Sequence, residues 1–462
     1  MNDDRYGLLV SALCGVVGLL IWTGFDTHAI IVESVLHSVN QRDPNAAGPY
    51  DGYYGIAVMN VFYMLSNLVV PSFANYMRSK WLMAISALLC ITYYLMFTLL
   101  NRYLFFLGNA LLGFAFAFFN TGQCLYVAEV STKKTLDRNQ PFLYAILSLS
   151  IFFAGVLYIV VTSASSTAGV ELKYREYSNQ DIYYFFGSLA CAASVCLVVC
   201  SLLPTRVVAN SIASGKTKNL TIKEQLVSTA KVLVHRRTLI LIPYYLYIGI
   251  YYTFTYNVLP TTILFTKNLS LYRYLPAYYS MAIAVGIISM SIASIFLSKR
   301  MQNFGLRPTY LIFIFTHAKL YLSIGDQKLD FHTVFLIALF TIPAWSTVRQ
   351  NDEPALLLQP SLLSILLIGF LLGVGDAASS TTRTVITSLV LPKHKTETFA
   401  TSRLFHAMAA SILLFTSSYL SVYHFIAILF LFLVAGSVGF WIASGKVLQV
   451  HDAPKEEILS DQ

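Results

Sequence analysis

Long apolar segments separated by short polar loops recur along the whole chain, and they limit it to one structural class. A helix needs about 20 mostly apolar residues to cross a bilayer. Of the 462 residues, 56% are hydrophobic and only 11% are charged, whereas soluble domains carry about 25% charged residues. The sequence therefore predicts an all-α, multi-pass membrane protein with about twelve transmembrane helices.

Most of the predicted spans are clear, and one is ambiguous. The clear segments are 6–33, 52–73, 81–100, 103–129, 141–161, 182–203, 238–259, 276–297, 361–391, 399–420 and 423–443. Two short apolar runs, 310–324 and 333–345, flank the polar stretch 325–331, and each run alone is short for a span. We expect one run to cross the bilayer and the other to be re-entrant or peripheral. The first segment lacks a convincing small-residue cleavage site, so it is predicted to be a span and not a signal peptide.

The longest hydrophilic stretch divides the chain into two halves of six helices. We predict an N-terminal half at 1–203, a basic linker at 204–237, a C-terminal half at 238–446 and a tail at 447–462. The linker holds seven Lys and Arg residues against one acid, Glu224. Within it, Thr221 to Leu233 has helical spacing with Thr221 as a possible N-cap, which predicts a short helix on the membrane surface.

Positive charge alternates from loop to loop, and this pattern predicts the orientation. Besides the linker, the basic loops contain Arg78 and Lys80; Lys133, Lys134 and Arg138; Lys299, Arg300 and Arg307; and Lys393 and Lys395. Loops rich in Lys and Arg stay in the cytoplasm. Both termini and the linker are therefore predicted to be cytoplasmic, in the plasma membrane or an endomembrane.

Several functional classes are disfavoured. The net charge of +9 resides in short loops between apolar segments, so it does not indicate nucleic-acid binding. All six cysteines fall inside apolar segments, which argues against a disulfide framework. The sequence shows no metal-binding cluster and no nucleophile–base pair. We therefore expect no enzyme activity and no cofactor, with the lipid bilayer as the first partner.

An internal repeat relates the fourth and tenth spans. Under a shift of 260 positions, Leu111-Leu112-Gly113 falls on Leu371-Leu372-Gly373, while Asn120, Thr121 and Gln123 fall on Ser380, Thr381 and Arg383. A polar patch thus recurs at the same depth in both spans. A weaker shift of 230 aligns Thr23 with Thr253. Repeated halves of this kind are typical of transporters, whose binding sites lie between the halves.

Polar side chains gather in the first, fourth, seventh and tenth spans. A charge at the bilayer centre costs at least about 2.5 kcal/mol, so such residues mark a protein-lined or water-filled interior. We predict a central cavity between the halves. Its candidate substrate-binding residues are Asp26, Asn120, Thr121, Gln123, Tyr252, Tyr256, Asp376 and Arg383.

Asp376 and Arg383 are the most informative of these residues. They share a helix face, but seven residues separate them by about 10.5 Å along the axis. A direct ion pair within the helix would be strained, so each is expected to contact another helix. His406, Gln123 and Glu129 are the candidate partners of Arg383. Two interpretations remain: these charges bind a solute or proton, or they hold neighbouring helices together.

Two glycosylation patterns occur outside the spans. Asn268-Leu269-Ser270 lies in a loop predicted to face outside, so Asn268 is a candidate acceptor. Asn219-Leu220-Thr221 has the same pattern but lies in the cytoplasmic linker, and we expect it to be unmodified.

Short motifs spread over most of the chain resemble the Unc-ninety-three family, the ion channel regulatory branch of the major facilitator superfamily. They include Thr23-Gly24-Phe25-Asp26-Thr27, Asn120-Thr121-Gly122-Gln123, Asp137-Arg138-Asn139, Phe152-Phe153-Ala154-Gly155 and Gly373-Val374-Gly375-Asp376. Departures from the family pattern are Asp26 in the first span and Phe119 with Asn120 in the fourth. The resemblance implies two six-helix halves in the major facilitator fold.

The resemblance also implies two alternative functions. One is transport of a small solute by alternating access. The other is a non-transporting role as a regulatory or trafficking subunit of an ion channel or receptor. The superfamily's loop motif is missing after the second span, and only a worn version, Ser298-Lys299-Arg300 with Gly305, follows the eighth. Because that loop is thought to latch transporters, its loss leaves room for the second function.

Overall fold

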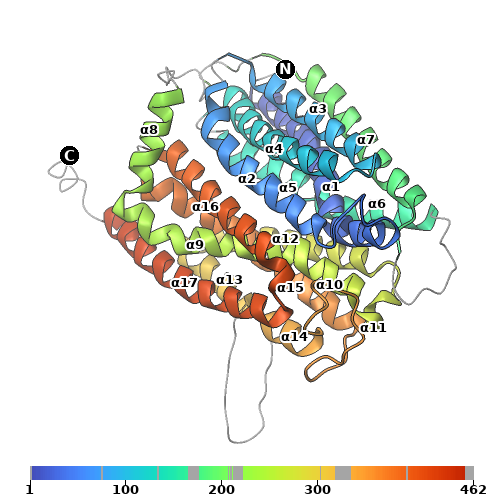
Figure 1. The fold of residues 1–462 in the computed structure, drawn as a ribbon. Helices are drawn as coiled ribbons and strands as arrows, with labels where there is room; N and C mark the ends of the chain where they lie inside the picture. Colours follow the sequence, from blue (N-terminus) through green and yellow to red (C-terminus); the bar gives the residue numbers. More distant parts are fainter. Residues whose placement is uncertain are drawn as a thin grey trace, which may run out of the picture.

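The predicted apolar segments fold into helices that run back and forth across one bundle (Figure 1). The computed structural model describes residues 3–73, 76–132, 135–164, 176–206, 208, 211, 222–301, 303–317, 334–391 and 394–452. Some predicted features lie outside these residues. They are Lys133, Lys134 and Lys393 in basic loops, Asn219 and Thr221 in the linker, the polar stretch 325–331, and the final part of the tail.

The first seven helices cover the predicted N-terminal half. They are α1 (Asp3–Arg42), α2 (Asp51–Phe73), α3 (Ser79–Thr98), α4 (Arg102–Val130), α5 (Leu136–Leu147), α6 (Ser150–Ala164) and α7 (Asn179–Leu202). A short helix in the linker, α8 (Ile222–Leu233), follows at the predicted position. The boundaries proposed for the two halves stay predictions.

The remaining helices cover the predicted C-terminal half. They are α9 (Arg236–Thr253), the π-helical turn η2 (Phe254–Val258), α10 (Leu259–Phe265), α11 (Lys267–Ser270), α12 (Leu275–Ser298), α13 (Arg307–His317), α14 (Val334–Thr341), α15 (Leu362–Val390), α16 (Lys395–Thr416), η4 (Ser417–Tyr419) and α17 (Val422–Asp452). The two runs of the ambiguous ninth span correspond to α13 and α14, and the residues between them lie outside the described part.

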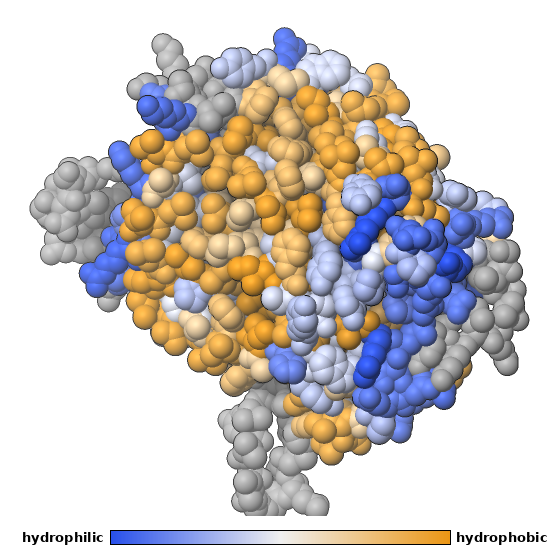
Figure 2. Space-filling model, in the orientation of Figure 1, coloured by the Kyte–Doolittle hydropathy of each residue, from blue (hydrophilic) through white to orange (hydrophobic). Residues whose placement is uncertain are grey.

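Among the described residues, eleven helices are long and apolar enough to cross a membrane. Figure 2 shows apolar side chains covering the flanks of the bundle, with hydrophilic residues gathered towards its ends. A hydrocarbon environment favours such a surface, because helices bond their backbone groups internally and the outer side chains seen in this view are apolar. The protein is a multi-pass membrane protein.

The two groups of helices lie side by side, with α8 beside them at one end (Figure 1). We call this end, which also holds the start of α1 and the end of α15, the linker end. The other end holds the start of α15 and is called the far end. The positive charge of the loops predicts that the linker end is cytoplasmic.

Two aligned glycines show how the repeat is built. Helix α15 begins 260 residues after the start of α4 and ends 260 residues after the end of α4. A Cβ on Gly113 of α4 would lie 2.4 Å from the carbonyl oxygen of Met59 in α2, and one on Gly373 would lie 2.0 Å from that of Ile283 in α12. In each half, the glycine therefore lets two helices touch backbone to backbone. The glycines of the Leu-Leu-Gly motif serve close packing, as small residues do between membrane helices.

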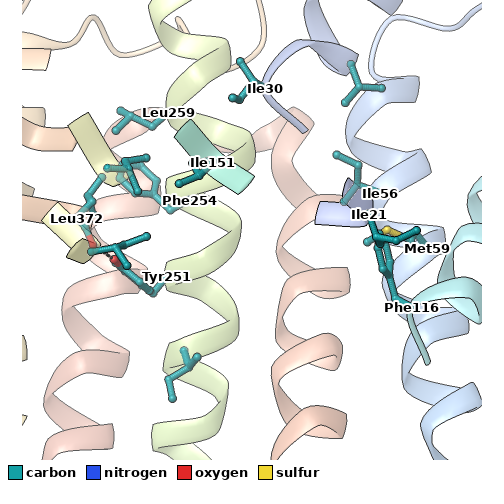
Figure 3. Packing of buried hydrophobic residues seen from close by; sticks show 14 of the residues in the cluster. Ile21, Ile30, Ile56, Met59, Phe116, Ile151, Tyr251, Phe254, Leu259 and Leu372 are labelled. Atoms are coloured by element: carbon teal, nitrogen blue, oxygen red, sulfur yellow. Dashed lines mark hydrogen bonds between the residues drawn. The ribbon is translucent and has the colours of Figure 1, made fainter. Parts of the chain in front are cut away.

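The core between these helices contains tyrosines whose hydroxyl groups bond to neighbouring backbone or threonine. In Figure 3, Tyr251 of α9 points to Leu372 of α15, whose carbonyl oxygen accepts its hydroxyl hydrogen at 2.5 Å. Tyr244 similarly bonds Thr382 Oγ1 at 2.7 Å. Buried phenols without such partners would be costly, so these bonds fix α9 against α15.

The fifth span, expected at 141–161, is interrupted in the structure. It consists of the end of α5 and all of α6, with a break at Ser148 and Leu149. The Ser148 hydroxyl bonds the Tyr144 carbonyl at 2.7 Å, and the Leu149 amide bonds Ile146 in a tighter turn. Competition of this kind between side chain and backbone bends helices. The break positions Ser150 at the start of α6.

Polar contacts join the two halves at the far end. Tyr53 of α2 donates a hydrogen bond to the Thr347 carbonyl at 2.7 Å, and Tyr54 bonds Ser418 at 3.0 Å. Arg273 reaches from the C-terminal half to the carbonyl of Thr162 at the end of α6. We call Tyr53, Tyr54, Thr347 and Ser418 the far-end gate, because they connect parts of the two halves that would have to separate to open this end.

Asn268 lies on α11 at the far end, where it is exposed. Its side chain bonds the exposed Gln359 at 2.9 Å. If the far end faces the glycosylating compartment, Asn268 accepts a glycan. We expect wild-type protein from eukaryotic cells to lose apparent mass on endoglycosidase treatment, and Asn268→Gln to abolish this shift. Asn219→Gln is the control and should leave it unchanged. The opposite pattern would contradict the predicted orientation.

Candidate functional site

Asp376 lies at the middle of α15 and is held by two tyrosines of the seventh span. Tyr252 donates its hydroxyl hydrogen to Oδ1 of Asp376, and Tyr256 donates to Oδ2 at 2.7 Å. The two phenol rings stack with centroids 5.6 Å apart. Asp376 is 9% exposed. Its two oxygens therefore both have hydrogen-bond donors, and the three predicted residues form one cluster.

A π-helical turn carries Tyr256. Pro260 has no N–H to donate to the carbonyl of Tyr256 four residues earlier, so one bond of the regular ladder is missing here. The chain instead forms η2 (Phe254–Val258), in which the Leu259 amide bonds the carbonyl of Phe254. Single π-helical turns often occur at functional sites. Four other tyrosines of the same span, Tyr244, Tyr245, Tyr247 and Tyr251, are fully buried core residues.

Asp26 of α1 approaches the same region from the other half. Its Oδ2 accepts a hydrogen bond from Ser150 at 2.7 Å, which the break before α6 makes possible. Asp26 and Asp376 lie close enough for their charges to interact. His28, two residues further along α1, points away and bonds Tyr93 at 2.6 Å within the N-terminal half. Asp26 and His28 therefore have separate partners on different helices.

Arg383 contacts His406 of α16, one of its three candidate partners. Its Nη1 lies 3.3 Å from Nδ1 of His406. An arginine can only donate, so Nδ1 accepts and the imidazole carries no charge that would repel the guanidinium. The other two candidates lie elsewhere: Glu129 accepts a bond from Ser79 at 2.8 Å, and Gln123 packs against Gly18 of α1. As expected, Asp376 and Arg383 each contact another helix.

A second arginine, Arg403 of α16, shares this region. It lies against Cys124 of α4, with Tyr63 of α2 and Tyr144 of α5 nearby. Arg403 was not among the predicted site residues, although it lies inside the predicted span 399–420. The criterion applied to Asp376 and Arg383, a charge within a span, would have found it. Tyr63, Tyr144 and Ser150 carry no comparable sequence signal.

The three predicted residues of α4 have different places. Asn120 is half-buried and donates to the hydroxyl of Tyr63 at 3.1 Å, close to Arg403. Thr121 is half-buried beside it. Gln123 is 5% exposed, and its Nε2 has no hydrogen-bond partner among the described residues. The structure brings Asn120 towards the interface between the halves and places Gln123 within the N-terminal half, beside α1.

These residues form a polar region between the halves with two parts. At mid-depth lie the carboxylates of Asp26 and Asp376, each hydrogen-bonded to hydroxyl groups. Towards the linker end lie Arg383 and Arg403. Within the described part of the chain, no group of His, Cys, Asp and Glu side chains is arranged to hold a metal ion. The arrangement can bind polar or charged groups by hydrogen bonds and charge.

Comparison with known protein families supports the motif evidence. A family model described as "Ion channel regulatory protein UNC-93" matches residues 43–441, which is most of the chain. The chain belongs to the UNC-93 family. Within it, the chain is 22% identical to UNC93-like protein MFSD11 of Xenopus laevis, over 97% of this chain and 98% of that protein. The same protein of Xenopus tropicalis is 23% identical, over 96% and 97% respectively. The motifs quoted above likewise resemble those of major facilitator superfamily domain-containing protein eleven.

Solved structures show that this UNC-93 family member has the major facilitator fold. The nucleoside transporter NupG matches with a TM-score of 0.62 at 11% identity, over 94% of this chain and 99% of that one. A D-xylose–proton symporter matches with a TM-score of 0.58 at 15% identity, over 94% and 95%. A transporter of the POT family matches with a TM-score of 0.63 at 11% identity, over 95% and 96%. Because identities are this low, these likenesses establish the fold alone.

Proposed function

We propose that this UNC-93 family member transports a small polar solute across a membrane by alternating access. The observation that carries the proposal is the charged region between the halves. Asp26 comes from the N-terminal half, whereas Asp376, Arg383 and Arg403 come from the C-terminal half. Intramembrane charges are costly and mark solute or ion pathways. The fold, which is shared with solved transporters, supports the same function.

In this mechanism the solute binds between Asp26 and Asp376 on one side and the two arginines on the other. The far-end gate is closed in this structure, so we infer that solute enters from the linker end. Tyr144 is 45% exposed and Cys124 is exposed beside Arg403, which supports access from that end. Opening would break the gate contacts and rock one half against the other around the site.

The gate provides a test of this movement. Tyr53→Phe removes one hydrogen bond between the halves, worth about 0.5–1.5 kcal/mol, so the far-end-open population should rise about two- to tenfold. Spin labels on cysteines at exposed Leu99 and Leu271 would report the opening as a longer distance. The native exposed cysteines are first replaced by serine.

The matched control is Tyr103→Phe. Tyr103 is 84% exposed at the same end of the molecule. The Tyr103→Phe substitution should therefore leave the distance distribution unchanged. A Tyr53→Phe distribution identical to those of the wild type and the control would contradict the assigned role of the gate.

Transport itself is tested with purified protein in proteoliposomes. A panel of labelled neutral, cationic and anionic solutes is offered, and accumulation is compared with protein-free vesicles. The proposal expects saturable uptake of at least one class. Absence of flux for every class of solute, with protein shown to be folded and inserted, would overturn it.

The family description motivates a second candidate, a regulatory or trafficking subunit of an ion channel or receptor. This function expects a stoichiometric membrane partner. Crosslinking in native membranes followed by co-purification would recover that partner. Recovery of the lone chain would count against this candidate.

A further inference from the structure

Arg383 and Arg403 contribute two positive charges to one place between the halves. Arg403 and His406 are three residues apart on α16 and therefore share a face of that helix. Arg383 contacts His406 from α15 at 3.3 Å. Both arginines act electrostatically on His406 and on Tyr144 of α5. The two guanidinium groups thus lie near the same side chains, although like charges repel.

Neither arginine forms an ion pair with a carboxylate within the described residues. The acid that acts on Arg383 is Asp376, but both of its oxygens accept hydrogen bonds from Tyr252 and Tyr256. The groups around Arg403 are the side chains of Cys124, Tyr63 and Tyr144, none of which is a carboxylate. Charges inside a membrane protein normally pair with an opposite charge or with backbone carbonyl groups. Here that counter-charge is not supplied by the neighbouring side chains.

The surrounding groups suit an anion. A guanidinium presents a planar fork of N–H donors that matches the two oxygens of a carboxylate or phosphate. The hydroxyl of Tyr63 and the amide of Asn120, which bond each other at 3.1 Å, stand beside Arg403 and can donate further hydrogen bonds. Because Arg403 comes from α16 and Cys124 from α4, an anion bound here contacts both halves.

We propose that Arg383 and Arg403 form an anion subsite, and that the solute is a small organic anion carrying a carboxylate or phosphate group. This inference rests on the proposed transport function for the identity of the solute. The anion subsite is separate from the carboxylates of Asp26 and Asp376 at mid-depth, which would face the opposite part of the same solute. Binding of the anionic group would draw α16 and α4 together at the linker end.

Cys124 is a built-in reporter of charge at this site. It is exposed and lies against Arg403, while Cys14, Cys90, Cys196 and Cys200 are buried. In a Cys191→Ser background, Cys124 is the accessible thiol. Its reaction with an anionic sulfonate methanethiosulfonate is compared with that of a cationic trimethylammonium analogue. The same thiolate attacks either reagent and displaces methanesulfinate, so the ratio of the two rates, normalised to a free thiol, cancels the thiolate fraction.

The wild type should favour the anionic reagent by about tenfold or more, as expected for a charged cleft. Arg403→Gln and Arg383→Gln should each lower the ratio several-fold, because each leaves one of the two charges, while Arg403→Lys keeps the charge and should preserve the preference. Arg300→Gln removes a charge at the exposed linker end and is the matched control, with an unchanged ratio expected. An unchanged ratio in Arg403→Gln, or a preference for the cation in wild type, would overturn the anion subsite.

Protection of Cys124 identifies the source of the anion. Succinate, benzoate and inorganic phosphate should slow labelling, whereas succinamide and benzamide should not. If phosphatidylglycerol micelles alone protected Cys124, the subsite would bind a lipid headgroup. The proposal that it binds a small anionic solute would then be wrong. If succinamide and benzamide protected Cys124 as well as succinate and benzoate do, the subsite would not recognise negative charge and the proposal would be wrong. Labelling needs no flux, so intact charge selectivity without transport would refute only the transport function.

Discussion

Gly373→Ala is expected to destabilise the protein by about 3 kcal/mol or more, at the upper end of overpacking effects. The new Cβ would lie 2.0 Å from the carbonyl oxygen of Ile283, a backbone atom that cannot rotate away. Helices α12 and α15 would have to separate along their whole crossing. Thermal unfolding of the purified protein in detergent should show a marked fall in midpoint and a loss of monodisperse material.

The repeat supplies a second variant and the chain supplies a control. Gly113→Ala places a Cβ 2.4 Å from the Met59 carbonyl and should destabilise the N-terminal half in the same way. A Cβ on Gly187 of α7 would meet nothing within 4 Å, so Gly187→Ala should be neutral or stabilising through helix propensity. Equal unfolding midpoints for all three variants would refute the backbone contacts described here.

Asp376→Asn and Arg383→Ala should each reduce uptake by about 10- to 100-fold while leaving the amount of inserted protein unchanged. Charge-assisted hydrogen bonds contribute about 1.5–3 kcal/mol each, which corresponds to this loss. Asp376→Asn keeps the shape of the side chain but removes the charge that Tyr252 and Tyr256 face. Initial rates in proteoliposomes, normalised to reconstituted protein, measure the effect.

Leu363→Ala is the control on the same helix, because Leu363 is 76% exposed and distant in sequence from both charges. It should transport at the wild-type rate. If Asp376→Asn and Arg383→Ala lower the unfolding midpoint but not the normalised uptake, these residues hold helices together and do not handle solute.

The sequence predicted the parts of the fold that depend on hydrophobic length. Apolar segments of membrane-spanning length became α1, α4, α15 and the other spans, because a helix is the structure that satisfies every backbone group in a bilayer. The repeat that relates the fourth and tenth spans by a shift of 260 positions could also be predicted. The structure shows why its glycine recurs. Gly113 and Gly373 each permit a backbone contact that a larger residue would prevent.

Side-chain partners could be predicted only where helix geometry limits them. The axial spacing of Asp376 and Arg383 excluded an easy pair within one helix, and the structure gives each another partner. Which helix supplies that partner depends on packing, which periodicity does not encode. The break that positions Ser150 against Asp26 and the π-helical turn of Tyr256 likewise arise from local competition for backbone hydrogen bonds. Arg403 was within reach of the sequence, since it is a charge inside a predicted span.

Transport of a small organic anion by this protein is tested most directly by an untargeted comparison of the solutes that vesicles accumulate. Proteoliposomes with wild-type protein, with Asp376→Asn, and without protein are incubated with the same mixture of small metabolites and analysed by mass spectrometry. We expect wild-type vesicles alone to accumulate a defined class of solutes, and this class to carry a carboxylate or phosphate group. Identical solute profiles in all three preparations would contradict it.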